Sequence, residues 1–193
     1  MKFPCCLPWL VLASLACEPA VPSPGPDPPP AAPSAHSGKN ALAEKMVAAH
    51  NRARAAVEPP AKPPLPPLSW SDDLVSVARQ WAEQCRFEHN PALKEEKLGE
   101  NLAAFSDATG TVAKAVGNWV AEATDYDLET NRCNPGAVCG HYTQVVWRGT
   151  REVGCAVVDC QKNSPFPQFP RWQLWVCDYS PPGNWVGERP YSP

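Results

Sequence analysis

The sequence predicts an α+β domain in which helices cover an antiparallel sheet. Apolar residues recur at helical spacing in three segments before residue 125. Three later segments, by contrast, are short, apolar and rich in β-branched residues, as strands are. A chain of 193 residues with 44% hydrophobic content can bury one sizeable core, so we expect one domain.

The first predicted helix starts near Asn40, a candidate N-cap, and ends before the Glu58-Pro59-Pro60 break. Its apolar stripe consists of Leu42, Met46, Ala49 and Ala53. His50 lies on or beside that stripe. We therefore expect His50 to be a packed structural residue and not a ligand.

Two more helices are predicted downstream. Ser71 is placed to cap the second, and Asp72 and Asp73 in its first turn suit the helix dipole. The stripe of this second helix ends at Cys85, so that cysteine should face inward. The third helix begins near Thr111, and Glu122 lies at the edge of its apolar side, from where its carboxylate can reach a cleft.

The predicted strands are Tyr142–Trp147, Glu152–Val158 and Trp172–Tyr179, with His141 at the start of the first. The proline-rich stretch Pro59–Pro67 must be a loop, because interior prolines abolish helix hydrogen bonds. Phe87–Leu102 has no clean period and is predicted to be an irregular surface connection.

The N-terminal sequence predicts export. Residues 1–16 have a lysine, a short apolar run and Ser14-Leu15-Ala16, as in a cleavable signal peptide. The apolar run is too short for a transmembrane helix. Residues 17–39 are rich in proline and predict a disordered spacer, and 40–193 form the domain. The protein is expected to be secreted and monomeric.

Cys17 leaves a second localisation open. It directly follows the predicted cleavage site, where a bacterial lipoprotein carries lipid, although Ser14 and Leu15 depart from the usual lipobox. A lipid-anchored protein at the cell surface is therefore the alternative to a secreted one. The net charge of −3 and the scattered Lys and Arg residues do not indicate nucleic-acid binding or a charged membrane-binding patch.

Five motifs carry a family resemblance. They are Gly140–Trp147 (Gly-His-Tyr-Thr-Gln-Val-Val-Trp), Val176–Trp185, Ala49–Arg52, Leu68–Trp70 and Gly99–Leu102. In this order and spacing they resemble the CAP superfamily of cysteine-rich secretory, antigen five and pathogenesis-related-one proteins, over roughly residues 40 to 191. The plant pathogenesis-related-one branch and its bacterial relatives look most similar. The resemblance implies an α-β-α sandwich.

The resemblance also implies a disulfide pattern and a site. Six paired cysteines allow fifteen connectivities, which sequence physics alone cannot separate. The family pattern implies Cys85–Cys160, Cys133–Cys139 and Cys155–Cys177. It likewise implies a cleft formed by two histidines and two glutamates, namely His89, Glu100, Glu122 and His141. These four could hold a divalent cation such as zinc, or form a hydrogen-bonded network only.

Three functions follow as hypotheses. The preferred one, which the resemblance implies, is an exported, non-catalytic binding module for a lipid, a sterol or another small apolar ligand, in a groove distinct from the four-residue cleft. A metal- or histidine-dependent extracellular hydrolase is the alternative, although no serine-hydrolase signature such as Gly-x-Ser-x-Gly occurs. A structural defence or interaction protein is the third.

Overall fold

The computed structural model describes residues 35–193, with side chains from Ala41 onward. The predicted signal peptide, Cys17 and residues 17–34 of the predicted spacer lie outside the described residues. No helix among residues 35–193 is long and apolar enough to cross a membrane.

One four-stranded sheet forms the centre, in the order β1-β5-β6-β2. The long strands β5 (Glu152–Cys160) and β6 (Trp172–Ser180) pair antiparallel, as the sequence predicts, and β6 also pairs antiparallel with β2 (Gly99–Ser106). The short β1 (Ser69–Trp70) runs parallel to β5. A separate two-stranded sheet pairs β3 (Tyr126–Asp127) with β4 (Arg132–Cys133).

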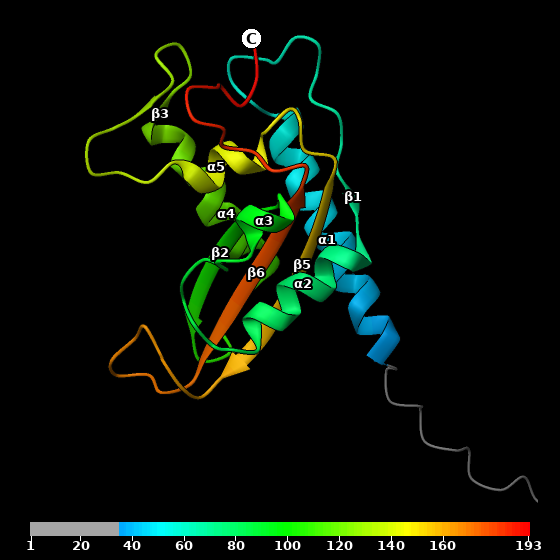
Figure 1. The fold of residues 1–193 in the computed structure, drawn as a ribbon, viewed down its shortest axis with the longest axis vertical. Helices are drawn as coiled ribbons and strands as arrows, with labels where there is room; N and C mark the ends of the chain where they lie inside the picture. Colours follow the sequence, from blue (N-terminus) through cyan, green and yellow to red (C-terminus); the bar gives the residue numbers. More distant parts are fainter. Residues whose placement is uncertain (1–34) are drawn as a thin grey trace, which may run out of the picture. The chain divides into compact units, whose positions relative to one another are not determined.

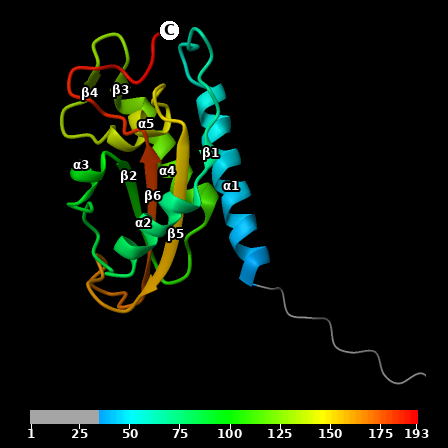
Figure 2. The same ribbon diagram turned by 45° about the vertical axis from the view of Figure 1, so that its right-hand side comes forward.

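Helices cover the two faces of the sheet, which gives the three layers of an α-β-α sandwich (Figures 1 and 2). Helix α2 (Asp72–Ala82) packs on one face. Helices α1 (Ala35–Ala55), α4 (Val112–Ala121) and α5 (Gly140–Val145) belong to the other layer. Gly154 of β5 permits the close approach of α2, because a Cβ there would collide with the backbone of Ser71 and Val75.

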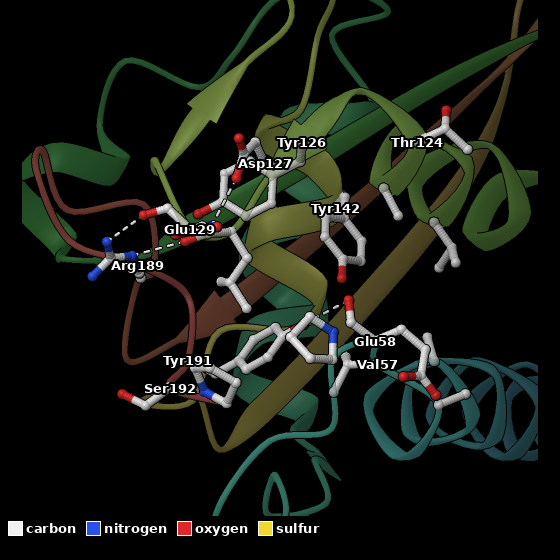
Figure 3. A pocket seen from close by; sticks show the side chains of 17 residues that line it. Val57, Glu58, Thr124, Tyr126, Asp127, Glu129, Tyr142, Arg189, Tyr191 and Ser192 are labelled. Carbon is white, nitrogen blue, oxygen red and sulfur yellow. Dashed lines mark hydrogen bonds between the residues drawn. The ribbon is translucent and has the colours of Figure 1, made fainter.

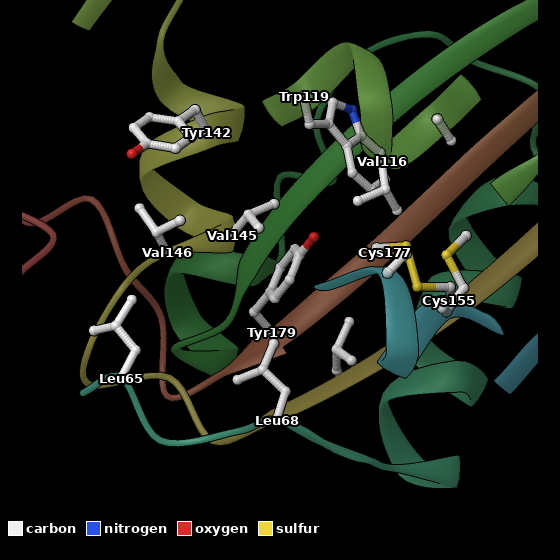
Figure 4. Packing of buried hydrophobic residues seen from close by; sticks show 14 of the residues in the cluster. Leu65, Leu68, Val116, Trp119, Tyr142, Val145, Val146, Cys155, Cys177 and Tyr179 are labelled. Carbon is white, nitrogen blue, oxygen red and sulfur yellow. A yellow bond between two sulfur atoms is a disulfide. The ribbon is translucent and has the colours of Figure 1, made fainter. Parts of the chain in front are cut away.

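Alternate residues of the strands supply the two cores. Leu174 and Val176 of β6 pack with Ala78 and Trp81 of α2. Trp175, Cys177 and Tyr179 point the opposite way, into the core under α1, α4 and α5. Figure 4 shows part of this second core, in which Trp119, Val145 and Tyr179 surround the same interior.

Side-chain caps start two helices where the sequence predicts them. Ser71 Oγ accepts the N–H of Leu74, and the side chain of Thr111 accepts the N–H of Lys114. Helix α1, in contrast, begins at Ala35, so Asn40 is not its cap. Residues Pro59–Pro67 have neither helix nor strand, as predicted.

The predicted strand Tyr142–Trp147 is wrong, because Gly140–Val145 form helix α5. Tyr142, Thr143, Gln144, Val145 and Val146 are all buried, so the segment has no exposed face from which a period can be read. The interaction that favours a helix is distant in sequence. Glu122 Oε2 accepts the backbone N–H groups of His141 and Tyr142, which a helix N-terminus leaves unpaired.

The prediction of an irregular Phe87–Leu102 segment is also wrong in part. It contains the short helix α3 (Leu93–Glu96) and the start of β2, so Glu100 and Asn101 lie on a strand and not in a loop. The polar start of β2 has no alternation of apolar and polar residues, so its sequence does not indicate a strand. It is a strand because it pairs with β6, which is distant in sequence.

All three predicted disulfides are present. Cys85 pairs with Cys160, Cys133 with Cys139, and Cys155 with Cys177. The Cys155–Cys177 bond joins opposite residues of β5 and β6, inside the core beneath α1. The Cys133–Cys139 bond closes a short loop that ends immediately before α5.

Arg54 of α1 is 2% exposed and binds three backbone carbonyls. Its Nε donates to Pro66 O at 2.9 Å, and its Nη1 donates to Val145 O at 2.9 Å and to Trp147 O at 2.8 Å. Burial lowers the pKa of Arg54 to about 10, so it remains charged at neutral pH. A buried cation thereby joins α1, the proline-rich loop and the end of α5.

We expect Arg54→Ala to destabilise the protein by about 3 kcal/mol, because three backbone carbonyls, two of them buried, lose their donor. Arg52→Ala on the exposed side of the same helix is the control and should cost less than about 0.5 kcal/mol. Denaturant unfolding with the disulfides intact measures both free energies. Equal stability of the two variants would contradict the role assigned to Arg54.

Candidate functional site

His141 and Glu122 form the first of two histidine–glutamate pairs. Glu122 follows the last residue of α4 and begins the 3-10 helix η1 (Glu122–Asp125). Its Oε1 lies 2.6 Å from His141 Nδ1, while Oε2 accepts the backbone N–H of His141 at 3.0 Å. The imidazole also stacks on Trp119, with ring centroids 6.3 Å apart. These contacts fix the position and the plane of the His141 ring.

His89 and Glu100 form the second pair. His89 Nδ1 lies 2.8 Å from Glu100 Oε1, which also accepts the backbone N–H of Asn90 at 3.1 Å. The Glu100 side chain is 1% exposed and that of His89 65% exposed, so a buried carboxylate holds a solvent-facing imidazole. The hydrogen bond to Glu100 raises the pKa of His89.

A chain of buried polar groups ties the pairs to the core. Asn101, next to Glu100 in β2, donates from Nδ2 to His141 O at 3.0 Å. Behind Asn101, the hydroxyl of the buried Tyr179 lies 2.9 Å from His50 Nε2. His50 Nδ1 donates to Met46 O, so Nε2 accepts from Tyr179. His50 is fully buried, as predicted, and burial lowers its pKa to about 4.

Sequence reasoning singled out the four His and Glu residues but gave no role to Asn101. Its signal was its place in Gly99-Glu100-Asn101-Leu102, directly beside a predicted site residue. Glu100 shares its β2 face with Leu102, which packs towards α2, whereas Asn101 points to the opposite face. The two pairs are thus held at the same end of β2 from its two faces.

The donor chemistry suits a metal at the imidazoles. Each Nδ1 pairs with a carboxylate, which leaves Nε2 as the available nitrogen, and carboxylates orient metal-binding histidines in this way. Within residues 35–193, however, no three His, Cys, Asp or Glu side chains lie close enough to hold a metal together. A bound cation would therefore take its remaining ligands from water or from a partner molecule.

Asp178 of β6 lies opposite Glu100 of β2 and is fully buried. Neither of its carboxylate oxygens has a hydrogen-bond partner, and Glu100 Oε2 also lacks one. Burial, with the charges of Glu100 and Glu96, raises the pKa of Asp178 to about 8. A protonated Asp178 is therefore the form that this environment favours.

The second feature of interest is a cavity of about 880 Å³. It lies between the C-terminal end of α1, the end of α4 with η1, the Tyr126–Glu129 segment and the C-terminal segment 189–193 (Figure 3). Tyr142 of α5, which directly follows His141 in the chain, also lines the cavity. Its walls include Ala53, Val57, Val120, Ala123 and Leu128. Sequence reasoning expected an apolar groove apart from the four-residue cleft but did not locate it.

Asp178→Asn should stabilise the protein at neutral pH by on the order of 2 kcal/mol. The folded pKa is raised, so folding of the wild type takes up a proton, and stability present below pH ~4 is lost as pH rises towards about 8. The variant should lack this loss, because an amide remains neutral over the whole range. Unfolding free energies measured from pH 4 to pH 8 check this. Parallel curves for the two proteins would contradict the assignment.

Comparison with known proteins agrees with the fold. Residues 47–179 match the cysteine-rich secretory protein family, CAP. The chain is 44% identical over 152 residues to a pathogenesis-related protein of PR-1 type from Sambucus nigra, covering 77% of this chain and 81% of that protein. It is 40% identical over 149 residues to peptidase inhibitor 16 from Mus musculus, covering 77% of this chain but only 29% of the relative.

A solved structure has a similar fold. The venom allergen-like protein 4 of Schistosoma mansoni superposes with a TM-score of 0.61 at 29% identity, covering 80% of this chain and 94% of that one. The sandwich, the three disulfides and the matched segment agree with one another, and the chain belongs to the CAP family of cysteine-rich secretory proteins, with a domain of the pathogenesis-related-one type.

Proposed function

We propose that this CAP domain is an exported, non-catalytic binding module that takes a lipid, a sterol or another apolar small molecule in the cavity beside Tyr142. The observation that carries the proposal is the cavity itself. A volume of about 880 Å³ with mainly apolar walls falls in the range of small-molecule sites. The predicted signal peptide motivates export.

The walls come from rigid elements as well as from loops. Ala53 and Val57 belong to α1 and its end, Val120 to α4 and Tyr142 to α5, all packed on the main core. Arg189 donates to the backbone carbonyls of Leu128 and Glu129, which attaches the C-terminal segment to the opposite wall. A preformed cavity loses little entropy on ligand binding.

The histidine–glutamate pairs offer less support for hydrolysis. Both glutamates are engaged by histidines and by backbone N–H groups, so they orient the imidazoles. Neither pair includes a serine, threonine or cysteine that could act as a nucleophile with the histidine as base. A hydrolase that uses a side-chain nucleophile with the histidine as base therefore ranks below the binding module.

Ala56→Phe should reduce binding of a neutral apolar fluorophore such as Nile red at least about tenfold, because the ring occupies the cavity. Ala56 lines the cavity and is exposed, so the fold should tolerate the change. Ala55→Phe is the matched control, since Ala55 is also exposed but does not line the cavity. Fluorescence titration compares the three proteins. Unchanged binding by Ala56→Phe, or no binding by the wild type, would refute the proposal.

We also propose a second function for the His89–Glu100 and His141–Glu122 pairs, namely reversible binding of a divalent cation such as zinc. The support is that the Nδ1 atom of each imidazole pairs with a carboxylate, which leaves its Nε2 as the ligand atom. Such a cation would supply a positive charge to a ligand at the cleft. The imidazoles would hold it, and the two glutamates would keep the rings in place.

His141→Ala should abolish the heat of zinc binding in calorimetry, because one of two imidazole ligands is lost. Glu88→Gln, an exposed change beside His89 that spares both pairs, should leave the heat unchanged. If wild type and His141→Ala give equal heats, the pairs are a hydrogen-bond network only.

A further inference from the structure

The charged side chains that line the cavity are mainly acidic. Three carboxylates line it, those of Glu58, Asp127 and Glu129, and Arg189 is the one lining residue with a basic side chain. Glu58 and Glu129 are exposed to solvent. Asp127 accepts the backbone N–H groups of Glu129 and Thr130, which lowers its pKa and keeps it ionised at neutral pH.

Arg189 offsets this charge only in part, because it brings one positive charge to a lining that has three carboxylates. Its Nε donates to Leu128 O at 2.8 Å, and its Nη2 donates to Glu129 O. Figure 3 shows the guanidinium turned to these two carbonyls on the side of the cavity away from Tyr142 and Glu58. An acidic ligand head would have to displace these contacts and then face the three carboxylates.

Three tyrosines add aromatic surface to the same lining. The rings of Tyr126 and Tyr142 have centroids 6.0 Å apart, and Tyr191 lines the same cavity. Two of the hydroxyls have partners within the protein, because Tyr126 donates to Asn131 Oδ1 at 2.6 Å and Tyr191 donates to Glu58 O at 3.4 Å. A ligand in the cavity meets electron-rich rings and carboxylates, and both attract a cation.

We propose that the cavity prefers a cationic amphiphile, whose alkyl chain lies against Ala53, Val57 and Leu128 and whose quaternary or protonated amine lies among the tyrosines and carboxylates. This inference rests on the proposed function, since it names the class of ligand that the same cavity takes. Charge complementarity selects the head group and apolar burial holds the chain.

Three probes with one chain length test the preference, namely decyltrimethylammonium, decanol and decanoate, each below its micelle-forming concentration. Calorimetric titration should give the tightest binding for decyltrimethylammonium and the weakest for decanoate. Added salt should weaken binding of the cation and leave that of decanol nearly unchanged. Tighter binding of decanoate than of decyltrimethylammonium overturns the cationic preference but leaves the cavity a binding site. Failure of all three probes to bind overturns the proposed function as well.

Charge-neutralising variants locate the effect. The double variant Glu58→Gln/Glu129→Gln should weaken decyltrimethylammonium about three- to tenfold, with decanol unaffected. Glu88→Gln/Glu95→Gln removes the same charge from exposed residues that do not line the cavity, and should change neither affinity by more than about twofold. Equal losses in the two double variants would show a general charge effect and refute the site.

Discussion

Helix α5 depends on two charged side chains that bind its opposite ends. It has six residues, too few to be stable alone. Glu122 accepts the N–H groups of His141 and Tyr142 at its start, and Arg54 donates to the carbonyls of Val145 and Trp147 at its end. The signs match the helix ends, with the anion at the N–H groups and the cation at the carbonyls.

Both candidate sites follow from this arrangement, because adjacent residues of α5 serve them. His141 pairs with Glu122, while Tyr142 lines the cavity. Glu122 contacts the backbone of both residues, so one carboxylate positions the imidazole of one site and a wall of the other. The sites are therefore separate in chemistry but share a support.

Several buried polar groups lie near the end of the sheet where β2 begins and the histidine–glutamate pairs are held. His50, Asn101 and Asp178 are buried there, and His50 hydrogen-bonds Tyr179. Buried polar groups cost free energy unless they are paired, and neither carboxyl oxygen of Asp178 has a hydrogen-bond partner. These buried polar groups lie near the histidine–glutamate pairs. The core against α2, in contrast, consists mainly of apolar side chains.

Local periodicity and capping were enough to predict the α+β class, helices α2 and α4 with their caps, strands β5 and β6, and the buried state of His50. Family motifs added the disulfide pairs and pointed to His89, Glu100, Glu122 and His141. The helix at Gly140–Val145 and the strand position of Glu100 could not be predicted in this way. They depend on hydrogen bonds that Glu122 accepts, that Arg54 donates and that β6 forms with β2, all of them with residues distant in sequence. The cavity likewise required the fold, since its walls come from four separate parts of the chain.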